Sequence, residues 1–372
     1  MKNLVLYPHI YHRLVNDNLF LYNTISSNHF WFPKYAQYLK CTAFGDTYEI
    51  INSNLKIAEI IDNEFGYIID SAKPSVTFCS INFSSSRDKI VESNTIIDGS
   101  NAMSCIESIS LYIDTIESEL KSPLLYRLLS FPHKNAINIS QYYNIFIQAK
   151  FTNLKEIEIV SALTERAANF IRNISTEASI SWRTLIFNLS QFITLRRLGE
   201  EFPNILFKAY IRPELKSSVA SHKSNNIYYI FWSEDINDFY KNNEISILPI
   251  IYDNEKQKSL INESLLTERD ILSTNKSLFD LHYDGFFNRT FMGHISVCED
   301  EIFVANQLIG KITSFKKDFN HWFYRPDNLW FYTRRKKSQC KDCPFVDLCP
   351  SISLAEVLGI ISNPCCINRR IF

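Results

Sequence analysis

Apolar and polar residues alternate in short runs at the start of the chain. Residues 9–15 and 19–24 both follow this pattern, and Asn16-Asp17-Asn18 separates them. Because Asn and Asp tolerate the left-handed backbone of a tight turn, the two runs predict a β-hairpin. The aromatic run at residues 29–32 predicts a third strand beside it.

The next segment, residues 52–66, has the period of an amphipathic helix. Asn or Ser caps its start, and Gly66 is expected to terminate it. The apolar positions that form one helical face are Leu55, Ile57, Ala58, Ile60 and Ile61. Together these elements predict a small α+β domain over residues 1–95, with residues 80–89 as its exit linker.

Strand-like apolar runs alternate with helix-like segments in the middle of the chain. The runs lie at residues 136–140, 156–161, 205–211, 227–232 and 244–251. A further run at residues 179–187 fits either a strand or the start of a helix. The later runs are about twenty residues apart, which suits repeated βα units. Residues 96–278 therefore predict an α/β fold with parallel strands, arranged as a barrel or part of one.

An open doubly wound sheet is the competing architecture for this middle segment. It is the weaker alternative because no glycine occurs between Gly99 and Gly199, where its phosphate-binding loop would be expected. Residues 279–372 form a third segment with a different pattern. It begins with a predicted hairpin around Glu299-Asp300 and ends in a cysteine-rich stretch.

Composition and charge narrow the class of protein. The chain has 372 residues, 46% hydrophobic and 14% aromatic, which is enough for two or three cores. Its formal net charge of -1 argues against a nucleic-acid partner, and the basic run Arg334–Lys337 is interpreted as a solvated turn. The start lacks the pattern of a signal peptide, and no uninterrupted apolar run reaches about 18 residues. A cytoplasmic location without a membrane partner is expected.

Five of the nine cysteines lie close together near the end of the chain. The spacing is Cys340-x2-Cys343-x5-Cys349, followed by adjacent Cys365 and Cys366. In a reducing compartment such cysteines favour metal or cluster ligation over disulfides. Four thiolates suit both zinc and an iron–sulfur cluster, so the spacing alone leaves the metal open.

The cysteine pattern resembles the SPASM domain, the iron–sulfur extension of radical SAM enzymes that modify ribosomally made peptides. The resemblance includes the preceding Gly-x4-Cys of Gly293 and Cys298, and it is greatest to the pseudo-radical-SAM proteins of Bacteroidales peptide-maturation systems. It implies a degenerate partial (β/α) barrel of radical SAM type followed by a SPASM-like domain. Ser353 stands where the SPASM pattern continues with a cysteine, and no cysteine lies between Cys105 and Cys298, so the first auxiliary cluster of that domain lacks most of its ligands and only the second cluster site is complete.

The resemblance implies one 4Fe-4S cluster, with zinc as the alternative. Its ligands would be Cys340, Cys343, Cys349 and Cys365, with Cys366 as the alternative fourth ligand. Cys298 is then interpreted as a buried hydrophobic residue.

The radical SAM reaction centre is missing from the sequence. That chemistry needs Cys-x3-Cys-x2-Cys, whereas Cys41, Cys79 and Cys105 are widely scattered. The first-strand candidate carries Gln141 and Asn144 where ligands would fall. SAM binding is therefore not expected. No catalytic residue is expected either, because the sequence has neither a Gly-x-Ser-x-Gly nor a His-Glu-x2-His motif, and the carboxylate pair Glu299-Asp300 is interpreted as part of a solvated turn.

The opening hairpin resembles a precursor-peptide recognition element, a winged-helix-like module of peptide-modifying enzymes. This resemblance implies that a strand edge captures a leader peptide by strand addition, with Phe30, Trp31 and Phe32 as candidate contacts. Isolated residues 1–95 are then expected to bind such a peptide. An ordinary packing domain is the alternative.

The sequence thus predicts a non-catalytic partner of peptide maturation that binds a precursor peptide, a radical SAM maturase, or both. Two alternatives remain open. One is a cluster-bearing electron-transfer protein or metalloenzyme of peptide modification, and the other is a scaffold with a structural zinc site.

Overall fold

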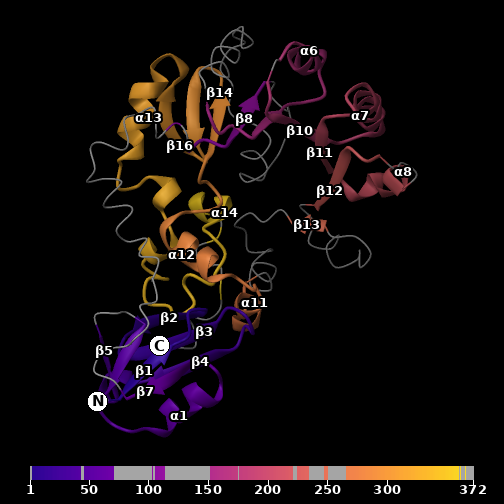
Figure 1. Ribbon diagram of the computed structural model, residues 1–372. Helices are drawn as coiled ribbons and strands as arrows, with labels where there is room; N and C mark the ends of the chain where they lie inside the picture. The colour runs from indigo at the N-terminus through magenta and orange to yellow at the C-terminus, as the bar shows by residue number, and fades with distance from the viewer. Residues whose placement is uncertain are drawn as a thin grey trace.

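The computed structural model describes most of the predicted segments of the chain. The described residues are 2–42, 46–70, 103, 105–113, 151–174, 176–220, 224–233, 247–249, 265–359, 361 and 365. Several expected features lie outside them: the linker at 80–89, the run at 136–140, Cys79, Gln141, Asn144 and Cys366. Figure 1 shows the N-terminal strands at one end of the molecule, a large sheet at the other, and the cysteine-rich segment between them.

Within the described residues, the large sheet has nine strands in the order β13-β12-β11-β10-β9-β8-β14-β15-β16. Strands β8 to β13 pair in parallel with their neighbours, as predicted for a mixed α/β fold. Their bounds are β8 Ser108–Tyr112, β9 Glu156–Val160, β10 Ser179–Ile186, β11 Leu206–Ile211, β12 Ile227–Ser233 and β13 Ile247–Pro249. The ambiguous run at 179–187 is therefore a strand, and β8 is a strand that no apolar run in the sequence predicted.

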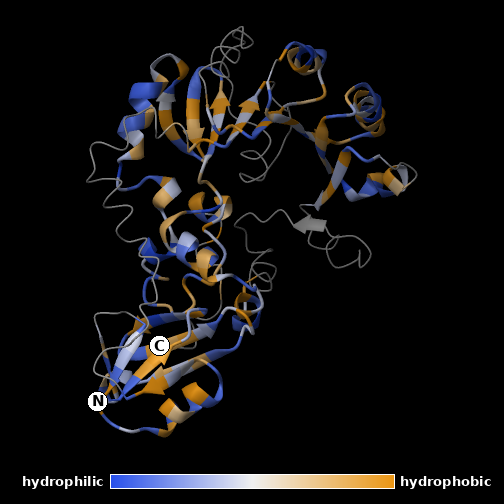
Figure 2. Ribbon diagram, viewed as in Figure 1, coloured by the Kyte–Doolittle hydropathy of each residue, from blue (hydrophilic) through white to orange (hydrophobic). Residues whose placement is uncertain are grey.

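Helices cover the apolar face of this sheet. They are α6 Glu165–Asn173, α7 Leu189–Glu201 and α8 Lys216–Ala220, and Figure 1 places them along its outer side. Thr164 caps α6 by accepting a bond from the Ala167 amide, and Asn188 caps α7 in the same way. Apolar strand residues such as Ile159 and Trp182 pack with these helices in one core, and Figure 2 shows the strands as largely hydrophobic.

The predicted hairpin around Glu299-Asp300 is confirmed and belongs to the same sheet. Its strands are β14 His294–Cys298 and β15 Glu301–Val304, and β16 Gln307–Lys311 follows. Glu299 takes the left-handed conformation with φ 56°, which closes the turn. Because β14 pairs in parallel with β8, one sheet includes strands from both sides of residue 278.

The N-terminal segment contains two small sheets and more strand than expected. The predicted hairpin and third strand are confirmed as β2 Ile10–Val15, β3 Asn18–Asn23 and β4 His29–Pro33, which form the three-stranded sheet. The turn residues Asn16 and Asp17 have positive φ, as their residue types predicted. A second sheet, in the order β5-β6-β1-β7, was not predicted; its strands are β1 Asn3–Leu6, β5 Leu39–Cys41, β6 Thr47–Ile50 and β7 Gly66–Ile69.

The predicted helix is present as α1, Leu55–Asp62, capped by the Asn54 side chain. The expectation that Gly66 terminates it is wrong. The chain reverses at Glu64, whose φ is 60°, and Gly66 begins β7. A Cβ atom at Gly66 would lie 2.4 Å from the Val5 carbonyl oxygen, so glycine here allows β7 to approach β1.

The remaining helices surround the cysteine-rich segment or cover the end of the large sheet. Their bounds are α11 Glu268–Leu272, α12 Leu278–Phe286, α13 Phe315–Phe323 and α14 Leu354–Val357. Within the described residues, none of the helices has the length and apolar character needed to cross a membrane.

Candidate metal centre and peptide-docking sheet

The four cysteines predicted as ligands lie in one buried cluster. Cys340, Cys343, Cys349 and Cys365 are each between 5% and 7% exposed and pack with the same apolar neighbours. The first three come from one irregular segment, residues 340–349, called here the cysteine loop. Its turns are closed by backbone bonds such as Cys349 N to Phe345 O at 3.0 Å. Cys365 joins them through a parallel bridge with Leu266.

Burial raises the pKa of the three thiols in the cysteine loop. Burial raises the pKa of Cys343 to about 11 and that of Cys349 to about 12, although nearby Arg334 opposes the shift at Cys349. Burial also raises the pKa of Cys340, and the nearby positive charges of Arg334 and Lys337 oppose that shift. Metal binding must therefore displace protons from these thiols, which makes the metal affinity dependent on pH.

The donor set fits a metal–thiolate centre in its chemistry. Four thiols share one buried cluster, and four thiolates are the usual ligand set of iron–sulfur clusters and of structural zinc. A mononuclear zinc site needs all four sulfurs about 2.3 Å from one ion, whereas a four-iron cluster binds each thiolate at a different iron. In the described part of the chain, no three His, Cys, Asp or Glu side chains are close enough to hold a single ion.

The basic run beside the cysteines is not a solvated turn, contrary to the prediction. Arg334 is 5% exposed and forms a two-pronged ion pair with Glu356, with both N–O distances 3.0 Å. Lys337 contacts the same carboxylate at 2.9 Å. Arg335 instead pairs with Asp347. These three cations face inward because buried carboxylates need opposite charges nearby, and they hold the cysteine loop against α14.

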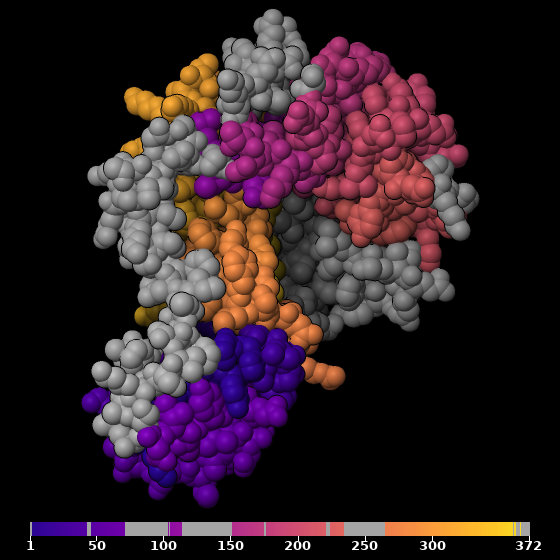
Figure 3. Space-filling view, viewed as in Figure 1, coloured from indigo at the N-terminus to yellow at the C-terminus, as the bar shows by residue number. Residues whose placement is uncertain are grey.

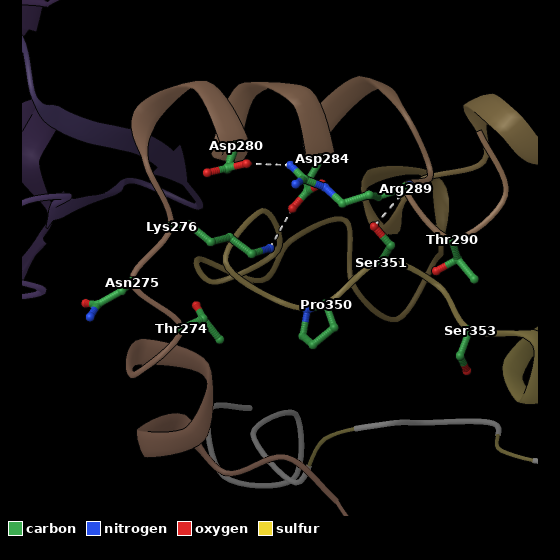
Figure 4. A pocket seen from close by; sticks show the side chains of 10 residues that line it. All are labelled: Thr274, Asn275, Lys276, Asp280, Asp284, Arg289, Thr290, Pro350, Ser351 and Ser353. Atoms are coloured by element: carbon green, nitrogen blue, oxygen red, sulfur yellow. Dashed lines mark hydrogen bonds and ion pairs between the residues drawn. The ribbon is translucent and has the colours of Figure 1, made fainter. Parts of the chain in front are cut away.

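Lys276 supports the cysteine loop from its other side. Its ammonium group donates to the carbonyl oxygens of Asp347 and Cys349 at 3.0 and 2.8 Å and pairs with Asp284 at 2.7 Å. A pocket of about 620 Å³ opens here. Figure 4 shows Lys276 and Arg289 directed at carboxylates of α12, and Arg289 approaches Ser351 of the segment that follows the loop.

The three-stranded N-terminal sheet packs directly on the cysteine loop. Tyr11, Phe20 and Tyr22 belong to the same buried cluster as the four cysteines. The rings of Phe20 and Phe345 lie edge to face with centroids 5.1 Å apart. Figure 3 shows the indigo N-terminal residues also against the orange residues that precede the cysteine loop in the chain, in agreement with the contact between β2 and α12. No sequence pattern indicated this contact.

Strand β4 is an edge of the three-stranded sheet, because among the described strands it pairs with β3 alone. The Asn23 amide donates to the Asn28 carbonyl at 2.8 Å just beyond this pair. The alternation of an antiparallel ladder then directs the backbone groups of Phe30 and Phe32 toward β3 and those of Trp31 outward. The position of Lys56 in α1 supports the outward direction of the Trp31 carbonyl, because the Lys56 ammonium group lies 3.4 Å from that oxygen.

The candidate peptide contacts have different environments. Phe32 is fully buried in the N-terminal core, and Phe30 is half-buried against Phe65 and Lys56. Trp31 lies on the opposite face, beside Phe20. Trp31 is thus the one of the three whose backbone faces the open edge, whereas Phe30 and Phe32 mainly build the sheet.

The three further cysteines that the structure describes lie apart from this centre. Cys298 is buried beside Tyr112 and Val160 in the large sheet, which confirms the prediction of burial. Cys41 is exposed on β5, and Cys105 is half-buried before β8.

The face of the large sheet opposite its helices carries a charged network. The Glu158 carboxylate accepts bonds from Arg183 at 2.5 Å, Lys208 at 2.9 Å and Ser110 at 3.0 Å. Burial opposes ionisation, but Arg183 and Lys208 outweigh it and lower the pKa of Glu158 to about 2. Burial lowers the pKa of neighbouring His294 to about 4. No motif in the sequence indicated these residues, whose only signal was the presence of polar residues at alternate strand positions.

Comparison with known proteins gives a coarse likeness. No protein-family model matches the chain. No curated protein matches it either. Among solved structures, Streptococcus suis SuiB is similar over 95% of this chain and 96% of its own, with 11% identity and a TM-score of 0.39. SuiB bound to precursor peptide SuiA is similar over 95% and 97%, with 10% identity and a TM-score of 0.40.

Proposed function

We propose that this protein is a non-catalytic, pseudo-radical-SAM component of a ribosomal-peptide maturation system. It binds a precursor leader peptide at β4 and carries one metal–sulfur centre, a 4Fe-4S cluster, in the cysteine loop. The observation that carries the proposal is the packing of a sheet with an open edge on four buried cysteines. A radical SAM maturase is the partner that this arrangement would serve.

The metal part of the proposal rests on the donor set. Cys340, Cys343, Cys349 and Cys365 supply four thiols from one buried cluster, and Arg334 places a positive charge near Cys340 and Cys349. When bound, the cluster would supply a covalent cross-link between the cysteine loop and the terminal segment. The degenerate partial barrel would take no part in SAM cleavage, because its sequence lacks Cys-x3-Cys-x2-Cys.

The peptide part rests on the edge of β4. An added strand would pair with the outward backbone groups of Trp31, and it would displace Lys56 from the Trp31 carbonyl. The released ammonium group would then favour an acidic residue in the peptide. Backbone pairing gives affinity, and we expect a dissociation constant in the roughly micromolar range of short segments that order on binding.

The test is a pair of proline variants in the full chain. Trp31→Pro removes an outward amide and should weaken leader-peptide binding by about tenfold or more, measured by calorimetry. Ile68→Pro is the matched control. Ile68 lies on the edge strand β7, and the Tyr7 to Phe65 bond at 3.1 Å places its backbone groups outward as well.

Equal loss of binding in both variants would show a general effect on folding rather than docking at β4. If the wild-type chain binds neither the leader peptide nor the maturase, the electron-transfer and scaffold functions take precedence. Iron and sulfide analysis of anaerobically purified protein then separates a cluster from a structural zinc ion.

A further inference from the structure

The three-stranded sheet of β2, β3 and β4, called here the docking sheet, shares one core with the cysteine loop. One face of β3, with Leu19 and Leu21, packs in the N-terminal core. The opposite face, with Phe20 and Tyr22, packs among the cysteines, and both of these side chains are fully buried. One face of the sheet is therefore buried by the N-terminal segment itself, and the other face is buried by the cysteine loop.

Asp347 links the two partners. It lies in the cysteine loop between Cys343 and Cys349 and is 2% exposed. Tyr11 of β2 donates a hydrogen bond to its Oδ2 atom, and Arg335 pairs with both oxygens at 2.7 and 2.5 Å. Arg13 of β2 approaches the same carboxylate at 3.9 Å and also donates to the Lys341 carbonyl at 2.8 Å.

Through these contacts, the conformation of the cysteine loop affects the stability of the docking sheet. Between Cys340 and Cys349 the loop has turns but neither helix nor strand, so its conformation depends on its cross-links and on the ion pairs at its sides. Burying the Asp347 carboxylate is favourable only while Tyr11 and the two arginines are in place. A loop that loses its centre would release both Asp347 and the apolar cover of Phe20.

We propose that metal occupancy of the cysteine loop controls the docking sheet, with Asp347 as the positioning residue that couples them. The inference rests on the proposed metal centre. It goes beyond that function because it states that the affinity for the peptide depends on whether metal is bound in the cysteine loop. By linkage, the peptide must raise metal affinity by the same factor that the metal raises peptide affinity.

The experiment compares hydrogen exchange of the full chain with its metal and after chelation. We expect exchange of β2 and β3 amides to become at least about tenfold faster after chelation, while β10 and β11 in the large sheet keep their protection. Peptide affinity should fall in parallel. Iron and zinc contents are measured on the same samples.

Two variants test the role of Asp347. Asp347→Asn keeps the shape of the side chain and removes its charge, so β2 and β3 should exchange rapidly even while the metal is retained. Tyr11→Phe is the milder variant and should show the same direction if Asp347→Asn fails to fold. Asp300→Asn is the control, because it removes a 2.9 Å ion pair with Lys311 on an exposed turn.

Metal removal without a change in β2 and β3 exchange would overturn the coupling and leave the proposed metal centre intact. Equal loss of protection in β10 and β11 would overturn it too, because that result indicates global unfolding. A chain that takes up no metal at all refutes both the coupling and the metal centre. If the β2 and β3 amides stay protected from exchange in both Asp347→Asn and Tyr11→Phe, then Asp347 does not couple the cysteine loop to the docking sheet.

Discussion

Acid should destabilise the large sheet in two separate stages, through His294 and then Glu158. The His294 ring lies 3.0 Å from the Ser108 hydroxyl and 3.3 Å from the Ser110 hydroxyl. Burial lowers its pKa from 6.5 to about 4, so between these values the unfolded chain binds a proton that the folded chain does not. Stability is therefore lost as the pH falls through this window.

Glu158 acts at lower pH and also in the destabilising direction. Its carboxylate is ionised in the folded sheet down to a pKa of about 2, against an ordinary value of 4.5. The stabilisation is fully present above about pH 4.5 and is lost as the pH falls toward 2. The difference corresponds to about 3 kcal/mol of unfolding free energy.

Urea unfolding of the full chain at a series of pH values measures both stages. Trp182 and Trp232 lie in β10 and β12 and are buried, so their fluorescence contributes to the signal from this sheet. A chelator in every sample keeps the metal state of the cysteine loop constant. His294→Gln should flatten the stability curve between about pH 6.5 and 4, and Glu158→Gln should flatten it between about 4.5 and 2.

Glu158→Gln should also destabilise the chain near neutral pH by roughly 3 kcal/mol, because Arg183 and Lys208 then lack a full opposing charge. Glu165→Gln is the control, since Glu165 pairs with Arg172 at 2.5 Å on the solvent-exposed side of α6 and should matter little. An unchanged slope in His294→Gln, or an unaffected neutral stability in Glu158→Gln, would refute this account of the network.

Three further predictions concern the metal centre and SAM. Cys365→Ala should lose more iron than Cys366→Ala, by metal analysis, because Cys365 lies in the buried cluster; equal loss would undo that assignment. Arg334→Lys should lower iron content, since lysine lacks the fork that pairs with Glu356; unchanged iron would make this pair dispensable. Reconstituted protein with SAM and a reductant should form no 5′-deoxyadenosine by chromatography, and its formation would contradict a non-catalytic role.

Some of the fold could be predicted because local patterns determine it. The hairpin of β2 and β3 followed from alternation and from Asn16 and Asp17, which take positive φ. Strands β9 and β11 followed from apolar runs that are long enough to be recognised. By contrast, β8 was missed, since its sequence Ser108–Tyr112 places serine at alternate positions that join the charged network.

The cysteine cluster could be predicted from spacing, but its surroundings could not. No sequence pattern singled out Asp347, although a carboxylate inside an apolar loop requires hydrogen-bonding or oppositely charged partners. Its partners are Arg335, twelve positions away, and Tyr11, 336 positions away. Contacts over such separations depend on tertiary packing, which the local periodicity of a sequence does not predict.

The shared core also changes the expectation for isolated residues 1–95. Removing the cysteine loop would expose Phe20 and Tyr22, which are fully buried in the whole chain. Exposing one such aromatic side chain costs about 1.5–3 kcal/mol, a large fraction of the stability of a domain this small. A fragment of residues 1–95 would thus present an apolar face beside an open strand edge, a combination that favours association between copies. Peptide docking at β4 is therefore a property to measure in the full chain, where the loop covers that face.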